Sequence, residues 1–162
     1  MAVAIREVLD RKETTQASNL PNKSLINEQT WEKLVGYMVK EKDMERSLAE
    51  RIMDQALGFL KLISVTPGRT FCPSKTVDIG WHAFLMHTRD YTAFCNEING
   101  QYIHHEPTPV EIVVARTGGV TETVRAMKAN GIFVDEVLWT KTADCDGSCD
   151  ANGTCGGGGN GC

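Results

Sequence analysis

The amino-acid sequence predicts a mainly α-helical protein: a compact bundle of about four to five helices with a disordered, Gly/Cys-rich C-terminal tail. Apolar residues recur at three- and four-residue steps between residues 25 and 131, which is the period of amphipathic helices. No long segment shows the strict alternation typical of half-buried strands. The tail holds no large apolar side chain, so it cannot bury enough surface to offset the entropy lost on ordering.

Length and composition indicate one globular domain with two tails. A chain of 162 residues, 41% of them hydrophobic, can build one core. We expect a flexible N-terminal arm over residues 1–23, a helical domain over 24–142 and the tail over 143–162. The net charge of −4 and the lack of a basic run argue against a nucleic-acid partner. No apolar run approaches the roughly 20 residues of a spanning helix, and the N-terminus is not typical of a signal peptide. We therefore expect a cytoplasmic protein without a membrane partner.

The first two helices are predicted from a start signal and from apolar periodicity. Asn27 is placed as the N-cap of a helix that runs to residue 42. A longer helix follows over residues 43–64, and residues 65–73, with two prolines and a glycine, end it. The apolar faces comprise Trp31, Leu34, Val35 and Met38 in the first helix and Met44, Leu48, Ile52, Ala56, Leu60 and Ile63 in the second.

A third helix is predicted to begin within Lys75–Asp78 and to run without interruption to the residue before Gly100. A glycine there suits the left-handed position that follows many helix C-termini. Its core-facing arc includes Trp81, Tyr91 and Cys95, so we expect the Cys95 thiol to be buried as a small hydrophobe.

The remaining part of the domain is predicted to hold one more helix. "HHEPTP" is excluded from regular helix because residues before proline avoid the α region. Residues 109–119 fit either a strand or a short helix. Residues 119–131 predict a fourth helix that ends at a glycine, and residues 132–142 predict an edge segment packed on the helices.

The candidate functional residues lie in the third helix and just after it, where all four histidines occur. Asp78 and His82 are four residues apart, hence about 40° apart on a helical wheel. An acid and an imidazole at that spacing can hydrogen-bond, which fixes the tautomer and raises the basicity of the ring. Such a pair suits a metal ligand with its partner, or a general base with its orienter. Equally, Asp78 can be a helix-start acid and His82 its structural partner.

Further residues are expected to complete or support this site. The chain turns after Gly100, and adjacent residues of an extended segment point opposite ways. We therefore expect either His104 or His105 to reach the pair, and the sequence does not decide which. Cys72, just before the helix, is an additional candidate ligand. His87 points some 140° from His82 and is expected to be a surface or packing residue. Trp81, Arg89 and Tyr91 are expected to support the site.

One stretch carries a family pattern: an acid, a Trp-His pair, "TRDY", a cysteine, a glycine and then "HHxPT". The positions are Asp78, Trp81, His82, Thr88, Arg89, Asp90, Tyr91, Cys95, Gly100, His104, His105, Pro107 and Thr108. This set resembles the glycine-rich domain-containing protein family. The resemblance implies an α-helical module, a shared acid, tryptophan and histidine set, and a Gly- and Cys-rich tail, but no reaction. Many members carry a second histidine where this chain has Phe84, so the site would have one imidazole fewer.

The tail holds Cys145, Cys149, Cys155 and Cys162 at gaps of three, five and six residues. Zinc knuckles favour two-residue gaps, so the tail is not a zinc ribbon. An EF-hand is excluded, because a count from Asp146 places Ala151 where that loop requires glycine. Without an export signal, thiols stay reduced and serve as ligands or modification targets. Three interpretations remain: a soft-metal site for Zn²⁺ or Cu⁺, a modification substrate with the helical body as recognition leader, and a low-complexity extension.

The function that we expect is a small metal-binding module, with Zn²⁺ as the foremost cofactor. No Gly-rich phosphate loop is present, so no nucleotide cofactor is expected. One alternative is a non-catalytic interaction or scaffold domain whose apolar helix faces bind a protein partner. Another is a precursor-like protein whose tail is modified. No nucleophile is paired with the Asp/His set in the sequence, which disfavours an enzyme.

Overall fold

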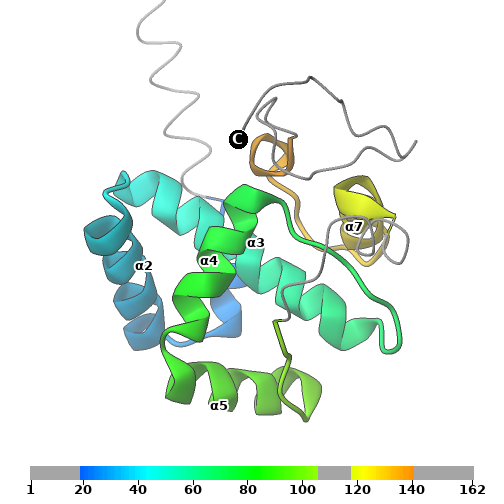
Figure 1. Ribbon diagram of the computed structural model, residues 1–162, viewed down its shortest axis with the longest axis horizontal. Coiled ribbons are helices and arrows are strands. Elements are labelled where there is room, and N and C mark those ends of the chain that lie inside the picture. The colour runs from blue at the N-terminus through cyan, green and yellow to red at the C-terminus, as the bar shows by residue number, and fades with distance from the viewer. Residues whose placement is uncertain (1–18, 106–117, 141–162) are drawn as a thin grey trace, which may run out of the picture.

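A computed structural model describes residues 19–105 and 118–140 of the protein (Figure 1). These residues form five α-helices, two short 3-10 helices and no strand, which confirms the predicted mainly α class. The elements are η1 (Pro21–Leu25), α2 (Glu28–Lys42), α3 (Arg46–Val65), α4 (Lys75–Leu85), α5 (Thr88–Asn99), α7 (Gly119–Ala129) and η2 (Glu136–Trp139). The predictions for the arm up to residue 18, for residues 109–117 and for the Gly/Cys-rich tail lie outside the described residues. No described helix is long and apolar enough to cross a membrane.

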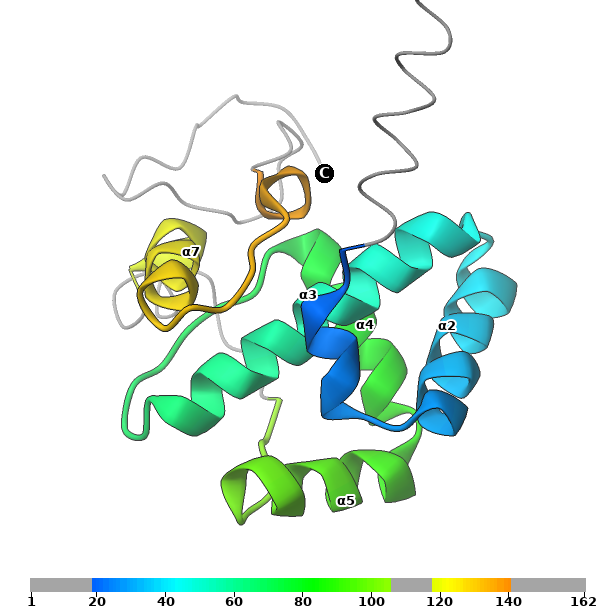
Figure 2. The same ribbon diagram turned by 180° about the vertical axis from the view of Figure 1, so that it is seen from behind.

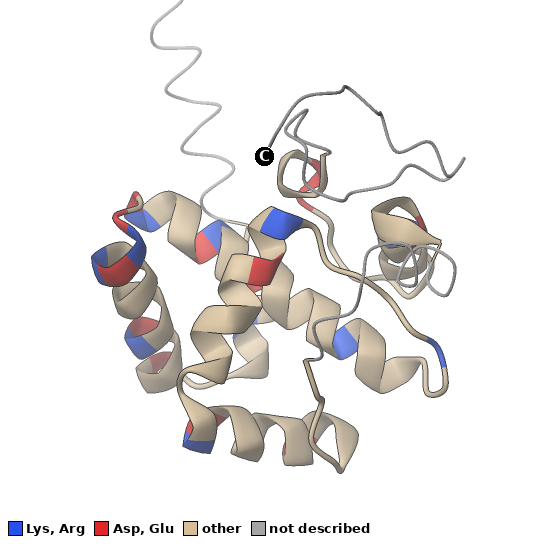
Figure 3. Cartoon of the chain, in the orientation of Figure 1, with Lys and Arg blue, Asp and Glu red and all other residues tan. Residues whose placement is uncertain are grey.

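Helix α3 is the centre of the fold. Helices α2 and α4 and the 3-10 helix η1 pack against it, and α5 crosses below α4 (Figures 1 and 2). Every residue from Ile52 to Leu60 is buried, although the sequence predicted only one buried stripe for this helix. The neighbouring elements therefore cover α3 on all sides along its middle turns. Charged residues of both signs lie along α2, at the left in Figure 3.

The helix starts follow capping rules. The Asn27 side chain accepts a hydrogen bond of 2.8 Å from the backbone N–H of Thr30, which confirms the predicted N-cap of α2. Ser74 caps α4 by accepting from the backbone N–H of Val77 at 3.1 Å. The same hydroxyl donates to the carbonyl of Leu138 at 2.6 Å, so the start of α4 is tied to η2.

The predicted third helix is in fact two helices. Helix α4 ends at Leu85 and α5 begins at Thr88, so the prediction of one uninterrupted helix was wrong. No glycine or proline marks the break. His87 leaves the helical region, and its Nδ1 lies 2.9 Å from the carbonyl oxygen of Ala83, which α4 no longer uses. The chain bends there, and Phe84 of α4 packs edge-on against Tyr91 of α5. Tertiary packing thus outweighs local propensity at this point.

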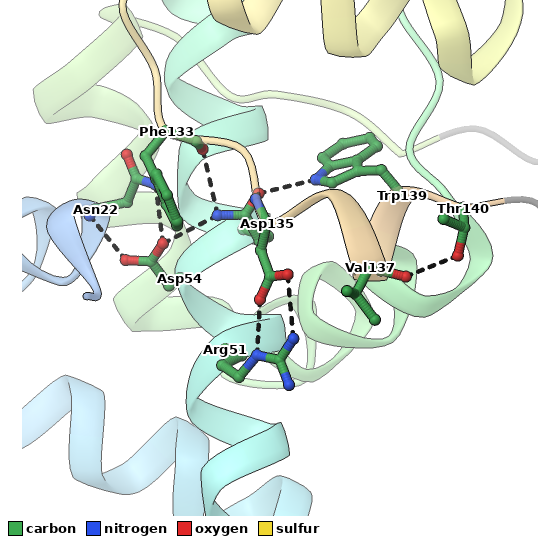
Figure 4. A network of polar contacts seen from close by, with 9 residues as sticks. Asn22, Arg51, Asp54, Phe133, Asp135, Val137, Trp139 and Thr140 are labelled. Carbon is green, nitrogen blue, oxygen red and sulfur yellow. Dashed lines mark hydrogen bonds and ion pairs between the residues drawn. The ribbon is translucent and has the colours of Figure 1, made fainter. Parts of the chain in front are cut away.

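A buried polar network fastens both ends of the domain to α3 (Figure 4). The Asp54 carboxylate accepts from the backbone N–H of Asn22 at 2.8 Å and from its side-chain amide at 3.0 Å. Burial raises the pKa of Asp54, against these hydrogen bonds, which lower it. Because Asn22 is buried in these contacts, η1 is tied to the central helix of the domain.

The C-terminal part of the domain is held by the neighbouring residue of α3. Gln55 Oε1 accepts from the backbone N–H of Asp135 at 3.0 Å and from Trp139 Nε1 at 2.8 Å. Arg51 adds a bidentate ion pair to Asp135, with N–O distances of 2.7 and 3.1 Å. The fourth predicted helix is confirmed as α7, and the predicted edge segment contains η2, packed on α4.

Candidate metal centre

Helix α4 presents Asp78 and His82 on one face, one turn apart. Asp78 Oδ2 lies 3.2 Å from His82 Nε2, as their four-residue spacing predicts. The capped first turn of α4 fixes the direction of Asp78, whose backbone N–H bonds the Ser74 carbonyl at 2.8 Å. The two side chains thus supply one part of a candidate ligand cluster, and both are held by the same helix.

The segment after α5 brings a second imidazole to the same place. Gly100 takes the left-handed conformation, with φ of 70°, and turns the chain back as expected. The buried Tyr91 hydroxyl donates to the carbonyl of Ile103 at 2.7 Å and accepts from Trp81 Nε1 at 2.9 Å. The His105 ring then lies on the Trp81 indole, with ring centroids 4.1 Å apart. His105 is therefore the member of the histidine pair that reaches the site.

Three potential ligand atoms converge at this point. His105 Nε2 lies 2.8 Å from Asp78 Oδ1 and 3.1 Å from His82 Nε2. In a tetrahedral zinc site with metal–ligand bonds of about 2.0–2.1 Å, neighbouring ligand atoms are roughly 3.3 Å apart. The cluster thus has close to the spacing of one coordination sphere. It is the one group of three or more metal-ligating side chains within the described ranges.

The number of protons available to Asp78, His82 and His105 indicates why their three mutual contacts suit a cation. Each Nε2 carries either one hydrogen or one lone pair. The two Nε2 atoms together can supply at most two protons for the three contacts. If both are protonated, neither can accept a hydrogen bond from the other across the 3.1 Å that separates them. A metal ion at the centre would satisfy all three lone-pair donors at once. At most two of the three contacts can therefore be hydrogen bonds at the same time.

The cluster is open to solvent on one side. The exposed fraction of the side chain is 58% for His82, 31% for Asp78 and 20% for His105. Three protein ligands with an open position can hold a zinc ion together with a water or another ligand. Without a metal, the same groups could exchange protons with a bound molecule.

A protein-family model described as UCP032817-like matches residues 22–122. This match covers more than half of the chain. The protein belongs to the UCP032817-like family. No curated protein and no solved structure matches the chain.

The family match corrects one prediction. The resemblance to glycine-rich domain-containing proteins was wrong, because the family shown by the match is a different one. Part of that resemblance was a Gly- and Cys-rich tail, which begins about twenty residues beyond the end of the UCP032817-like match. The three clustered residues all lie within the matched range.

Two predicted site residues of this UCP032817-like domain, His104 and Arg89, lie away from the cluster, and so does His87. His104 is exposed, and its ring contacts that of Tyr102 at 4.8 Å between centroids. His87 packs edge-on against Tyr37 at the corner of α4 and α5, as expected of a packing residue. Arg89 is exposed on α5, beyond the break that the sequence did not indicate.

The cysteines differ in their relation to the cluster. Cys72 precedes α4, and its backbone exchanges hydrogen bonds with the Thr123 hydroxyl of α7 at 2.8 and 3.3 Å. The three-residue ligand cluster does not include the Cys72 thiol. Cys95 is fully buried, as predicted. The tail thiols Cys145, Cys149, Cys155 and Cys162 lie outside the described residues.

One connection was missed from sequence. Trp81 and Tyr91 were expected to support the site, but both were assigned to the core arc, and their hydrogen bond to each other and to Ile103 was not foreseen. Burial raises the pKa of Tyr91 above its ordinary value of 10.0, which keeps the hydroxyl protonated and able to donate. The sequence signal for this link is a tyrosine on the predicted core-facing arc, ten residues after Trp81.

Proposed function

We propose that this protein is a metal-binding module in which Asp78, His82 and His105 hold a transition-metal ion, with Zn²⁺ the preferred one. The observation that supports the proposal is the convergence of two Nε2 atoms, 3.1 Å apart, on the Asp78 carboxylate, whose Oδ1 lies 2.8 Å from His105 and whose Oδ2 lies 3.2 Å from His82. These atoms come from an α-helix and from a return segment 23 residues further along the chain. Their meeting therefore depends on the tertiary fold and not on local sequence alone.

The ligand types favour zinc over the hard cations. Calcium and magnesium prefer sites made of oxygen atoms, whereas imidazole suits zinc, copper, iron and nickel. One carboxylate and two neutral imidazoles would leave a divalent ion with a net charge of +1. A zinc ion has no geometric preference of its own and accepts the near-tetrahedral spacing of this cluster.

The fold prepares the cluster before the ion arrives. The Trp81–Tyr91–Ile103 hydrogen bonds and the packing of the His105 ring against the Trp81 indole, at an interplanar angle of 45°, hold the return segment in place. Preorganised ligands lose less conformational entropy on binding, which raises affinity. A tyrosine and a tryptophan buried behind the ligands thus act as positioning residues for His105.

Zinc affinity tests the proposal. Untagged protein is freed of metal with a chelator and titrated with Zn²⁺ in competition with a chromophoric indicator. His82→Gln and His105→Gln each remove one ligand, and each should weaken binding by at least about tenfold, the lower range of effects for metal-site substitutions. Because the tail thiols can also take up zinc, all variants keep the same tail.

His104→Gln is the matched control, since His104 is the adjacent exposed histidine outside the cluster. It should leave zinc affinity unchanged. Equal affinities for the wild-type chain, His82→Gln and His105→Gln would refute the proposal and favour a structural role for the cluster. In that case His82→Ala would change stability alone, typically by about 0.5–3 kcal/mol.

A further inference from the structure

Helix α7 and the 3-10 helix η2 border a small cavity that is separate from the candidate metal centre. None of the residues that line it belongs to the cluster of Asp78, His82 and His105. Its volume is about 250 Å³, which is below the roughly 300–1,000 Å³ of pockets that hold drug-sized ligands. The cavity therefore suits a small molecule of about the size of one amino acid.

One part of the cavity wall is apolar. Val120 and Val124 are four residues apart on one face of α7, and Trp139 of η2 lines the cavity with them. Trp139 is held in place, because its Nε1 donates to Gln55 Oε1 at 2.8 Å (Figure 4) and its ring centroid lies 6.3 Å from that of Phe59. The apolar wall is therefore formed before a ligand arrives, and little protein entropy is lost when an apolar group enters it.

The polar part of the wall carries one positive and one negative charge. Lys128, one turn beyond Val124, forms an ion pair with Glu136, the first residue of η2. The side chains are 53% and 70% exposed, so the pair itself contributes little to stability and separates at low cost. A ligand with a single charge would be attracted by one of these groups and repelled by the other. A ligand that carries both charges can pair with both.

We propose that this cavity binds a free amino acid with an apolar side chain, such as leucine. The apolar side chain contacts the two valines and the indole. The α-carboxylate accepts from the Lys128 ammonium, and the α-ammonium donates to the Glu136 carboxylate. The hydroxyls of Thr121 and Thr140 also line the cavity and can form further hydrogen bonds with the charged end of the ligand. This binding function goes beyond the metal-binding function proposed above and does not depend on it.

NMR spectroscopy of the nitrogen-15-labelled full-length protein tests the proposal. The probe is L-leucine, and a chelator is present so that leucine meets no metal ion. Leucine should cause saturable shifts of the backbone amides of Val120 and Val124 and of the indole N–H of Trp139. Two analogues each lack one charge, since isoamylamine has no carboxylate and isocaproate has no ammonium. Each should bind about tenfold more weakly, as expected for the loss of one charge-assisted hydrogen bond.

Variants of the charged pair test the same contacts from the side of the protein. Lys128→Met and Glu136→Gln should each weaken leucine binding about tenfold. Arg125→Met is the matched control, because Arg125 is an exposed cation of α7 that does not line the cavity. It should leave leucine binding unchanged. The same spectra report whether each variant is folded, and the comparison of leucine with its analogues needs the wild-type chain alone.

Three results would overturn the proposal. The first is the absence of saturable shifts at the cavity residues. The second is an equal affinity for leucine and for either analogue, because the charged pair would then not select the ligand. The third is an equal loss of binding in Arg125→Met and in the two cavity variants, which would indicate a general effect of surface charge. None of these results bears on zinc binding.

Discussion

Tyr91 connects the core to the candidate site through a single oxygen atom. Its hydroxyl lies between Trp81 Nε1 and the Ile103 carbonyl, both buried, and it has no exposed surface. Without that oxygen, an indole N–H and a carbonyl would each lose a partner in a place that water does not reach. Loss of a buried partner costs about 1–3 kcal/mol, more than the net value of the bond itself.

Tyr91→Phe should therefore lower the free energy of unfolding by about 1–3 kcal/mol. It should also weaken zinc binding, because the segment that carries His105 loses its anchor. Urea denaturation and the zinc titration measure the two effects. Tyr102→Phe is the control, since Tyr102 is exposed and its ring only contacts its neighbours. If Tyr91→Phe changes stability alone, Tyr91 does not position His105.

Asp54 is a second residue whose chemistry depends on burial. Its oxygens accept from two groups of Asn22, from the backbone N–H of Lys23 and from Gln55 Nε2 at 2.8 to 3.1 Å. Asp54→Asn would replace one acceptor oxygen by an NH₂ group that faces other donors. We expect a loss of about 1–3 kcal/mol in the free energy of unfolding, measured by urea denaturation at neutral pH.

The same residue should give stability a pH dependence. Burial raises the pKa of folded Asp54 above its ordinary value near 3.8, so the folded state holds this proton more tightly than the unfolded state does. The resulting stabilisation is complete below pH 3.8 and is lost as pH rises through the raised value. The difference in unfolding free energy between the wild-type chain and Asp54→Asn should therefore change over this range. Parallel pH profiles for the two chains would contradict the prediction.

At the scale of elements, the crossing of α3 and α4 depends on the absence of a side chain at Gly80. A Cβ atom there would lie 2.9 Å from Ala56 Cβ and 3.1 Å from the Ile52 carbonyl oxygen. The Ile52 carbonyl belongs to the backbone of the central helix, which cannot yield as a flexible side chain can. The two helices therefore touch almost backbone to backbone, and α4, which carries Asp78 and His82, cannot shift on α3.

Gly80→Ala should destabilise the protein by about 1–3 kcal/mol, the usual effect of overpacking a core. Gly36→Ala offers the matched control, because nothing lies within 4 Å of a Cβ at that exposed position of α2. That substitution should instead stabilise the protein by about 0.4–1 kcal/mol through helix propensity. Thermal unfolding of the two variants checks the opposite signs. Equal shifts in the two would mean that the α3–α4 contact is looser than described.

The elements that local rules govern could be predicted from sequence, and those that packing governs could not. Asn27 caps α2 and Gly100 ends α5 because each residue type has its own backbone chemistry. The break at His87 follows instead from the contact of α5 with the core, and no local signal marks it. Likewise, the middle of α3 is buried on all sides because neighbouring elements pack on it, whereas its sequence indicates only one buried apolar face.

The candidate site shows the same division. The pair Asp78 and His82 follows from a four-residue helical step and could be predicted without coordinates. The choice of His105 over His104 depends on how Ile103 is anchored by Tyr91, 12 residues earlier in the chain. Arg89 was expected to support the site only because the two helices were taken as one. Sequence periodicity thus predicts which side chains meet within one helix, but not the direction that the chain takes after the helix ends.

For the whole molecule, a bound ion would join segments that are distant along the chain. His82 and His105 are 23 residues apart, and the ion would close the loop formed by the end of α4, by α5 and by the return segment. Binding to the folded state alone at 100 times the dissociation constant adds about 2.7 kcal/mol to stability. For a domain of this size the melting temperature should rise on the order of 10 °C.

Differential scanning fluorimetry with added zinc measures this rise. The wild-type chain and His104→Gln should show it, and His105→Gln should show little or none. Magnesium, which imidazole ligands bind poorly, should have no effect in any of the three. A zinc-dependent rise that is equal in His105→Gln would mean that the ion stabilises the protein from another site.

The two ends of the described domain are held by neighbouring side chains of one helix. Asp54 binds η1, and Gln55 binds the segment that runs from Phe133 to Trp139 (Figure 4). Domains whose ends lie close together tolerate new connections between them. A circular permutant that joins residue 140 to residue 19 through a short linker, and that opens the chain in the exposed turn at Gly68, should therefore retain the helical architecture. In such a rearranged protein, the order of the helices along the chain would change while their neighbours in space stay the same.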